Sequence, residues 1–107
     1  MKIITTNKGL GYYDFEIYSL NMARFADGKL EDEVFGLDYI TIHREYRGNG
    51  YGSILLKHIE SEMKKIGAKK IRGEFIPQDR TPIEVLRKFY EDNGYKIERG
   101  YVEKDLI

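Results

Sequence analysis

Three glycines lie close together in the segment RGNGYG (47–52), between a strongly apolar stretch and a long amphipathic one. Glycine has no Cβ, so Gly48, Gly50 and Gly52 let the backbone turn sharply and direct several N–H groups at one point. The start of the helix expected after them adds a partial positive charge. This arrangement predicts a site for an anion such as a pyrophosphate, although a plain strand-to-helix turn would have the same composition.

The glycine segment differs from the common nucleotide-binding loops. It lacks the Gly-Lys-Ser/Thr ending of a Walker A loop, and Ser53 stands where the Rossmann fingerprint has its third glycine. The sequence therefore predicts neither ATP nor NAD as the ligand.

The length and composition of the chain suit a single domain over residues 1–107. Of its 107 residues 41% are hydrophobic, and 18 basic and 18 acidic side chains give a formal net charge of +0. Without excess positive charge we expect no nucleic acid and no membrane as partner. The absence of cysteine excludes thiolate chemistry, and with His43 and His58 well separated we expect no metal site. No signal-like apolar run opens the chain, which favours a cytoplasmic protein.

The charge is unevenly distributed along the chain. Residues 44–72 hold eight basic and three acidic side chains, whereas the segments before and after them are acidic. This middle segment could attract phosphates, or its lysines could be the solvated end of a helix.

The elements expected before the glycines are strands. Residues 2–6 are mostly β-branched, which predicts a strand. The apolar residues within 12–25 fit both the alternation of a strand and the stripe of a helix, and we favour the strand. Asp27-Gly28 predicts a tight turn. The nearly unbroken apolar run from Val34 to His43 predicts a central strand.

Helices alternate with strands in the second half of the chain. Apolar residues at helical spacing predict a helix from about Gly50 to Ile66, ended by Gly67. Residues 71–76 predict a strand. Thr81 is expected to cap a second helix that ends at Gly94, and residues 95–102 predict a final strand, which gives the order β-β-β-α-β-α-β.

Two segments resemble the signatures of a known family. ITIHREYRGNGYGSILL (40–56) resembles the coenzyme A loop of the GNAT family of N-acetyltransferases, with Arg47, Gly50 and Gly52 at the matching places. FYEDNGY (89–95) resembles the second signature of that family. The resemblance implies an α/β (α+β) fold with a mixed, mostly antiparallel sheet, splayed central strands and two main helices.

The resemblance also implies acetyl-CoA as cofactor and a set of residues that bind it. The pyrophosphate would lie on the loop amides and the Ser53 hydroxyl, and the pantetheine would pair with the bulged central strand. The implied residues are Ile40, Thr41, Ile42, Arg47, Gly48, Asn49, Gly50, Tyr51, Gly52 and Ser53.

Catalytic residues are implied less directly. Tyr90 corresponds to the tyrosine that protonates the departing thiolate in many members, and a phenol is protonated at neutral pH. The alternative is that Tyr90 is a core aromatic. Asp38 and Glu74 are candidates for the general base, against the alternative that both are solvent-facing strand carboxylates.

The chain departs from the family mainly in length before the central strand. About 33 residues precede it, so the helices that usually roof the acceptor site are reduced or absent, and the site is open or completed by a second subunit. The leading hypothesis is acetyl transfer to a primary amine of a small molecule or protein by direct attack, since no cysteine could carry the acyl group. The alternatives are a non-catalytic coenzyme A-binding module and a small interaction domain without coenzyme A affinity.

Overall fold

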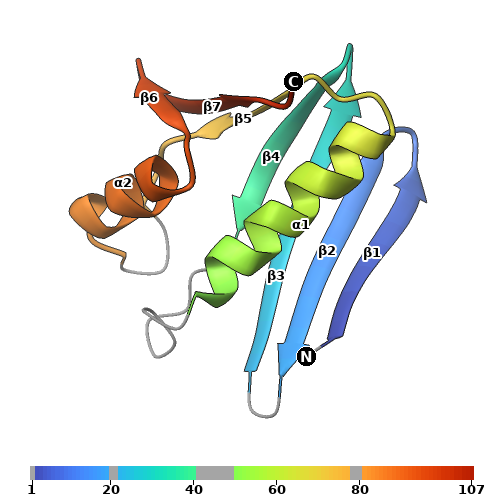
Figure 1. Ribbon diagram of the computed structural model, residues 1–107, viewed down its shortest axis with the longest axis horizontal. Helices are drawn as coiled ribbons and strands as arrows, with labels where there is room; N and C mark the ends of the chain where they lie inside the picture. Colours follow the sequence, from blue (N-terminus) through green and yellow to red (C-terminus); the bar gives the residue numbers. More distant parts are fainter. Residues whose placement is uncertain (1, 20–21, 41–49, 78–80) are drawn as a thin grey trace.

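A single seven-stranded sheet with two helices makes up the computed structural model, which describes residues 2–19, 22–40, 50–77 and 81–107. The strand order is β1-β2-β3-β4-β5-β7-β6, and only β4 and β5 are parallel. The elements are β1 (Lys2–Gly9), β2 (Tyr12–Ser19), β3 (Met22–Glu31), β4 (Val34–Ile40), α1 (Tyr51–Lys65), β5 (Lys70–Glu74), α2 (Ile83–Asp92), β6 (Lys96–Glu98) and β7 (Tyr101–Asp105). The expected α+β fold with a mixed, mostly antiparallel sheet is confirmed (Figure 1).

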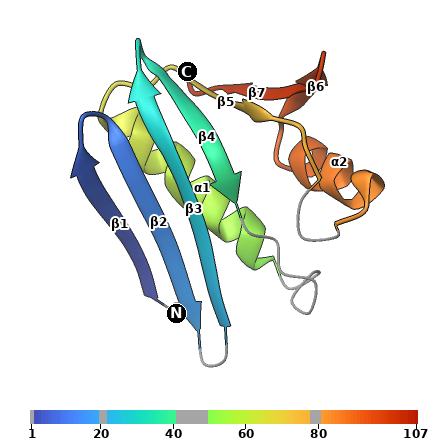
Figure 2. The same cartoon turned by 180° about the vertical axis from the view of Figure 1, so that it is seen from behind.

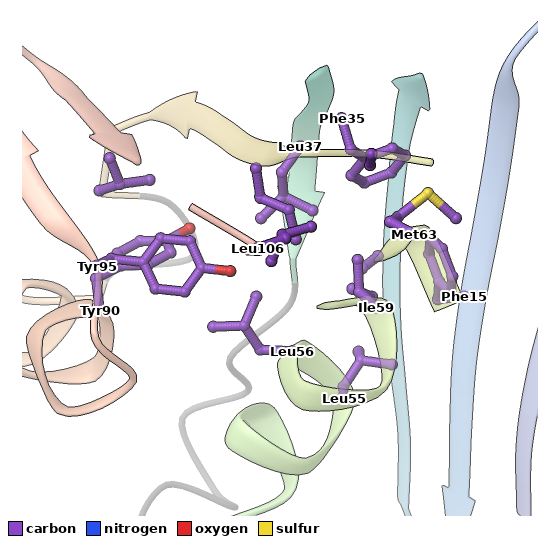
Figure 3. Packing of buried hydrophobic residues seen from close by; sticks show 14 of the residues in the cluster. Phe15, Phe35, Leu37, Leu55, Leu56, Ile59, Met63, Tyr90, Tyr95 and Leu106 are labelled. Atoms are coloured by element: carbon purple, nitrogen blue, oxygen red, sulfur yellow. The ribbon is translucent and has the colours of Figure 1, made fainter. Parts of the chain in front are cut away.

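The core lies between α1 and one face of the sheet. Phe15 and Ile17 of β2 alternate with more exposed residues, and both are fully buried. The ring of Phe15 meets that of Phe35 edge-on at 5.8 Å between centroids. From α1 come Leu55, Leu56, Ile59 and Met63, all buried at helical spacing (Figure 3). Each such side chain stabilises the fold by about 1.5–3 kcal/mol. Strand is correct for the described part of residues 12–25 because the alternation fits the core, but the expectation of one strand is wrong: β2 ends at Ser19, and β3, antiparallel to it, begins at Met22.

The expected turn at Asp27-Gly28 is wrong, because both residues lie inside β3. A Cβ on Gly28 would overlap the carbonyl oxygen of Gly36 and the ring of Phe35, so the glycine makes room for a core ring. The turn between β3 and β4 falls instead at Asp32 and Glu33, whose φ angles are 52° and 65°. Two positive φ angles give the twist that a two-residue hairpin needs.

The C-terminal expectations also need correction. Residues 95–102 do not form one strand, because the chain reverses at Arg99-Gly100 and β6 pairs antiparallel with β7. Thr81 is buried and is not the N-cap, which is Pro82. The helix ends expected at Gly67 and Gly94 are confirmed, since both glycines follow the C-caps with φ angles of 100° and 86°.

The face of the sheet opposite α1 carries no helix from the described part of the chain (Figure 2). β1 and β2 are joined by a two-residue turn, Leu10-Gly11, and the described residues before α1 are all strands and turns. Neither of the two described helices is both long and apolar enough to cross a membrane.

Candidate active site

The start of α1 is open to an anion. Gly50 is the N-cap with φ 78°, a left-handed conformation that glycine adopts without strain, and its carbonyl accepts the amide of Ile54 at 3.0 Å. No side chain caps the helix, and its first turn holds no acidic residue. The first amides of a helix have no partner within the helix, and the dipole adds partial positive charge. Gly50, Tyr51, Gly52 and Ser53 therefore fit the phosphate group of a cofactor.

The other expected cofactor residues fall at the edge of the described chain or beyond it. Ile40 is half-buried at the end of β4 and lies opposite Ala26. Thr41, Ile42, Arg47, Gly48 and Asn49 lie outside the described residues, as does His43.

The two central strands separate, as the resemblance implied. The parallel pairing of β4 with β5 begins at Val34 and Lys70 and ends at Leu37 and Gly73. Beyond these pairs β4 diverges from β5 (Figure 2). On the other side of β4, Leu37 and Tyr39 pair with successive residues of β3, which leaves Asp38 as a bulge residue.

A cavity of about 330 Å³ lies at this separation. Asp38 and Glu74, the two candidate bases, both line it, together with Arg72, Ile76 and Tyr101. The structure therefore brings together two carboxylates that lie far apart in the sequence.

The cation nearest to these two carboxylates in the cavity wall is engaged with another acid. Arg72 pairs with Glu103 at 3.3 Å and lies over the Tyr101 ring at 4.1 Å from its centroid. Among the described residues, neither Asp38 nor Glu74 has an ion-pair partner. Burial, and then the charge of Asp38, raise the pKa of Asp27 on the neighbouring strand.

Tyr90 lies in the core and not among the residues that line this cavity. It is 4% exposed, and its ring contacts that of Phe89 and, as Figure 3 shows, lies beside that of Tyr95. Burial raises the pKa of Tyr90 to about 12. The phenol therefore keeps its proton throughout the neutral range.

A buried polar link joins the end of α2 to α1, and it was not predicted from the sequence. Asn93, 4% exposed, donates from Nδ2 to the Ser53 Oγ at 3.0 Å and to the Phe89 carbonyl at 2.8 Å. Its own carbonyl accepts from the Lys104 Nζ at 2.9 Å. The one available signal was the position of Asn93 inside the second signature segment, next to Gly94.

Lys104 joins this link to a buried carboxylate on α1. Its Nζ lies 2.9 Å from the Glu60 Oε1, and the Tyr95 hydroxyl donates to the Glu60 Oε2 at 2.9 Å. Burial and the charge of Glu60 raise the pKa of Tyr95. The network fixes the C-terminal hairpin and the end of α2 against α1.

Comparison with known proteins places the chain in a family. The model of the acetyltransferase (GNAT) domain matches residues 7–97, and the chain belongs to this family. Among solved structures, the PaiA N-acetyltransferase from Thermoplasma acidophilum, in complex with coenzyme A, is similar with 24% identity and a TM-score of 0.75. That match covers 90% of this chain but only 62% of the Thermoplasma protein.

Two further structures share the fold at different lengths. The ribosomal-protein-S18-alanine N-acetyltransferase from Escherichia coli matches with 18% identity and a TM-score of 0.72, over 92% of this chain and 72% of its own. The anti-CRISPR protein AcrVA5 matches with 19% identity and a TM-score of 0.70, over 89% of this chain and 99% of its own. The short form of the fold is therefore known elsewhere.

Proposed function

We propose that the protein is an acetyl-CoA-dependent N-acetyltransferase that acts on a primary amine. The observation that carries this proposal is the uncapped start of α1, with Gly50 in a left-handed conformation and no acidic residue in the first turn. The cavity between β4 and β5, with two carboxylates in its wall, supports it as a place for an amine. Family membership supports the same chemistry.

The chain's own residues would bind the cofactor at two places. The amides of residues 50–53 would hold the pyrophosphate, together with Arg47, Gly48 and Asn49, which precede them in the sequence. The backbone of residues 40–42 would pair with the pantetheine. Bound acetyl-CoA would supply a thioester-activated acetyl group.

Acid and base roles are assigned to three side chains. Asp38 or Glu74 would accept the proton of the attacking amine, since each is a cavity carboxylate without an ion pair among the described residues. Tyr90 would return a proton to the leaving thiolate. Its raised pKa keeps the proton available but makes its transfer less favourable than from an ordinary phenol.

The burial of Tyr90 supports a second candidate function, a coenzyme A-binding module without catalysis. Replacing Tyr90 by phenylalanine separates the two, because the ring contacts remain and only the hydroxyl is lost. Catalysis through Tyr90 requires a fall in kcat with unchanged acetyl-CoA affinity. A kcat that does not change removes Tyr90 from the reaction, and a wild-type protein that binds acetyl-CoA without acetylating any amine supports the binding module.

Calorimetric titration with acetyl-CoA tests the proposal at its first step. Gly52→Glu introduces a carboxylate in the first turn of α1, and we expect it to weaken binding at least about tenfold. Ser61→Glu adds the same charge to an exposed position further along α1 and should leave affinity within about twofold. No binding by the wild type at about millimolar acetyl-CoA would refute the proposal and favour an interaction domain.

A further inference from the structure

One face of the sheet carries no helix from the described residues and is lined by tyrosine and carboxylate side chains. On β2, Tyr12, Asp14, Glu16 and Tyr18 alternate with the core residues and point away from α1. Figure 2 views the sheet from this side, with α1 behind it. We call the outward side chains of β2, β3 and β4 the open face.

The short turn between β1 and β2 leaves the open face without cover from this part of the chain. Leu10 and Gly11 close the turn between β1 and β2, and the Gly11 carbonyl accepts the amide of Leu30 at 2.7 Å. A Cβ on Gly11 would overlap the carbonyl oxygen of Leu30, so this turn lies tightly on β3. A turn of two residues leaves no chain between these strands that could cover the face.

The charges of the open face are mostly negative. Its described carboxylates outnumber its described basic side chains, although Glu31 pairs with Lys29 at 3.7 Å and Asp14 pairs with Lys8 of β1 at 3.6 Å. Asp14 and Asp27 are directly opposite each other in the β2–β3 register. The Oδ1 of Asp27 is buried and has no hydrogen-bond partner among the residues that the structure describes. Glu16 and Asp38 form no ion pair with another described residue, and their negative charge complements a cationic ligand.

Exposed aromatic rings lie among these carboxylates, and one of them contacts a cation. Tyr12 is 44% exposed and Tyr18 is 40% exposed. The Lys29 Nζ lies 5.1 Å from the centroid of the Tyr12 ring. Tyrosine faces attract lysine and arginine side chains, so this composition suits basic side chains on a chain that crosses the strands.

The extent of the open face favours a peptide over a small amine as its ligand. The cavity of about 330 Å³ adjoins the open face only along β4, whereas an eight-residue strand such as β2 is roughly 26 Å long. A second copy of this protein is disfavoured because two open faces would bring like charges together. We propose that the open face binds an extended basic segment of a protein, and directs one of its lysines to the cavity that contains Asp38 and Glu74.

This inference rests on the proposed function for the fate of the lysine, but its binding step can be tested alone. A fluorescently labelled peptide of lysine and arginine residues interspersed with glycine would be titrated by anisotropy without acetyl-CoA. The double variant Asp14→Lys with Glu16→Lys reverses two charges of the open face outside the proposed catalytic residues. We expect it to weaken peptide binding at least about tenfold.

A matched control makes the same charge change elsewhere. Glu84→Lys with Glu91→Lys alters two exposed positions of α2 and should leave peptide affinity within about twofold. Acetyl-CoA affinity should be unchanged in both double variants, which also shows that they fold.

The outcomes separate the two proposals. Peptide binding that depends on the open face, in a protein that binds no acetyl-CoA, refutes the proposed function and keeps the docking surface. Acetyl-CoA binding without peptide binding, or equal peptide affinity in wild type and the open-face variant, overturns the inference. It is also overturned if only a linear polyamine binds, or if sedimentation shows a dimer that the open-face variant abolishes.

Discussion

Replacing Asn93 by alanine removes the side chain that joins the end of α2 to the first turn of α1. The amide loses its hydrogen bonds to the Ser53 hydroxyl and to the Phe89 carbonyl, at 3.0 Å and 2.8 Å. Each such bond contributes about 1 kcal/mol, so we expect the free energy of unfolding to fall by about 2 kcal/mol. For a chain of this length, that lowers Tm by roughly 10 °C.

The same substitution should weaken acetyl-CoA binding through Ser53. The Ser53 oxygen accepts a hydrogen bond from Asn93, so the Ser53 hydroxyl proton is directed away from Asn93. A phosphate at the start of α1 would accept a hydrogen bond from this hydroxyl. A hydrogen bond to a charged group contributes about 1.5–3 kcal/mol, and loosening it by part of that amount reduces affinity roughly fivefold. Ser53→Ala, which removes the whole bond, should cost about tenfold or more.

A double-mutant cycle measured by calorimetry and urea unfolding tests this chain of causes. In the Ser53→Ala background, Asn93→Ala should change acetyl-CoA affinity by less than about twofold. Asp92→Ala is the matched control, since Asp92 is an exposed neighbour whose ion pair with Lys88 should contribute at most about 1 kcal/mol. The reasoning is refuted if Asn93→Ala weakens binding equally with and without the Ser53 hydroxyl.

Three further predictions concern stability. Gly28→Ala should lower the free energy of unfolding by about 3 kcal/mol, because its Cβ would overlap backbone and a core ring; Gly36→Ala, with its nearest contact at 3.7 Å, is the control and should cost under about 1 kcal/mol in urea. The raised pKa of Asp27 means that its ionised form opposes folding, so stability falls as pH rises through that pKa. Asp27→Asn should therefore raise the free energy of unfolding at about pH 7, and an equal increase at about pH 7 and pH 3 would contradict this. Lys104→Met leaves Glu60 buried without its nearest cation and should cost about 2–3 kcal/mol, with partial recovery in the double variant that adds Glu60→Gln.

Helix positions and most strands could be predicted from local sequence. The apolar spacing from Ile54 to Met63 and the glycine at position 67 placed α1 correctly, because helix periodicity and glycine termination depend only on neighbouring residues. The alternation of Phe15 and Ile17 with charged residues likewise favoured a strand over a helix.

Turn positions were less secure, because the same dipeptide fits both a turn and a strand. Asp27-Gly28 has turn composition, but the Phe35 ring across Gly28 keeps it within β3. Conversely, Arg99-Gly100 interrupts a stretch that looked like one strand. Whether such a dipeptide forms a turn or stays within a strand depends on a ring from another strand or on the edge of the sheet. Neither can be inferred from the neighbouring residues in the sequence.

The sequence alone determined the two helices, most of the strands, the glycine-rich start of α1 and the family resemblance, since each of these depends on a short stretch of chain. Only the tertiary structure decided which side chains meet. Asp38 and Glu74 share a cavity because the parallel pairing of β4 and β5 ends at Leu37 and Gly73 and the strands separate. The Asn93–Ser53 bond and the open face similarly arise from packing between segments distant in sequence, because strand register and helix docking bring them together and no local pattern encodes that distance.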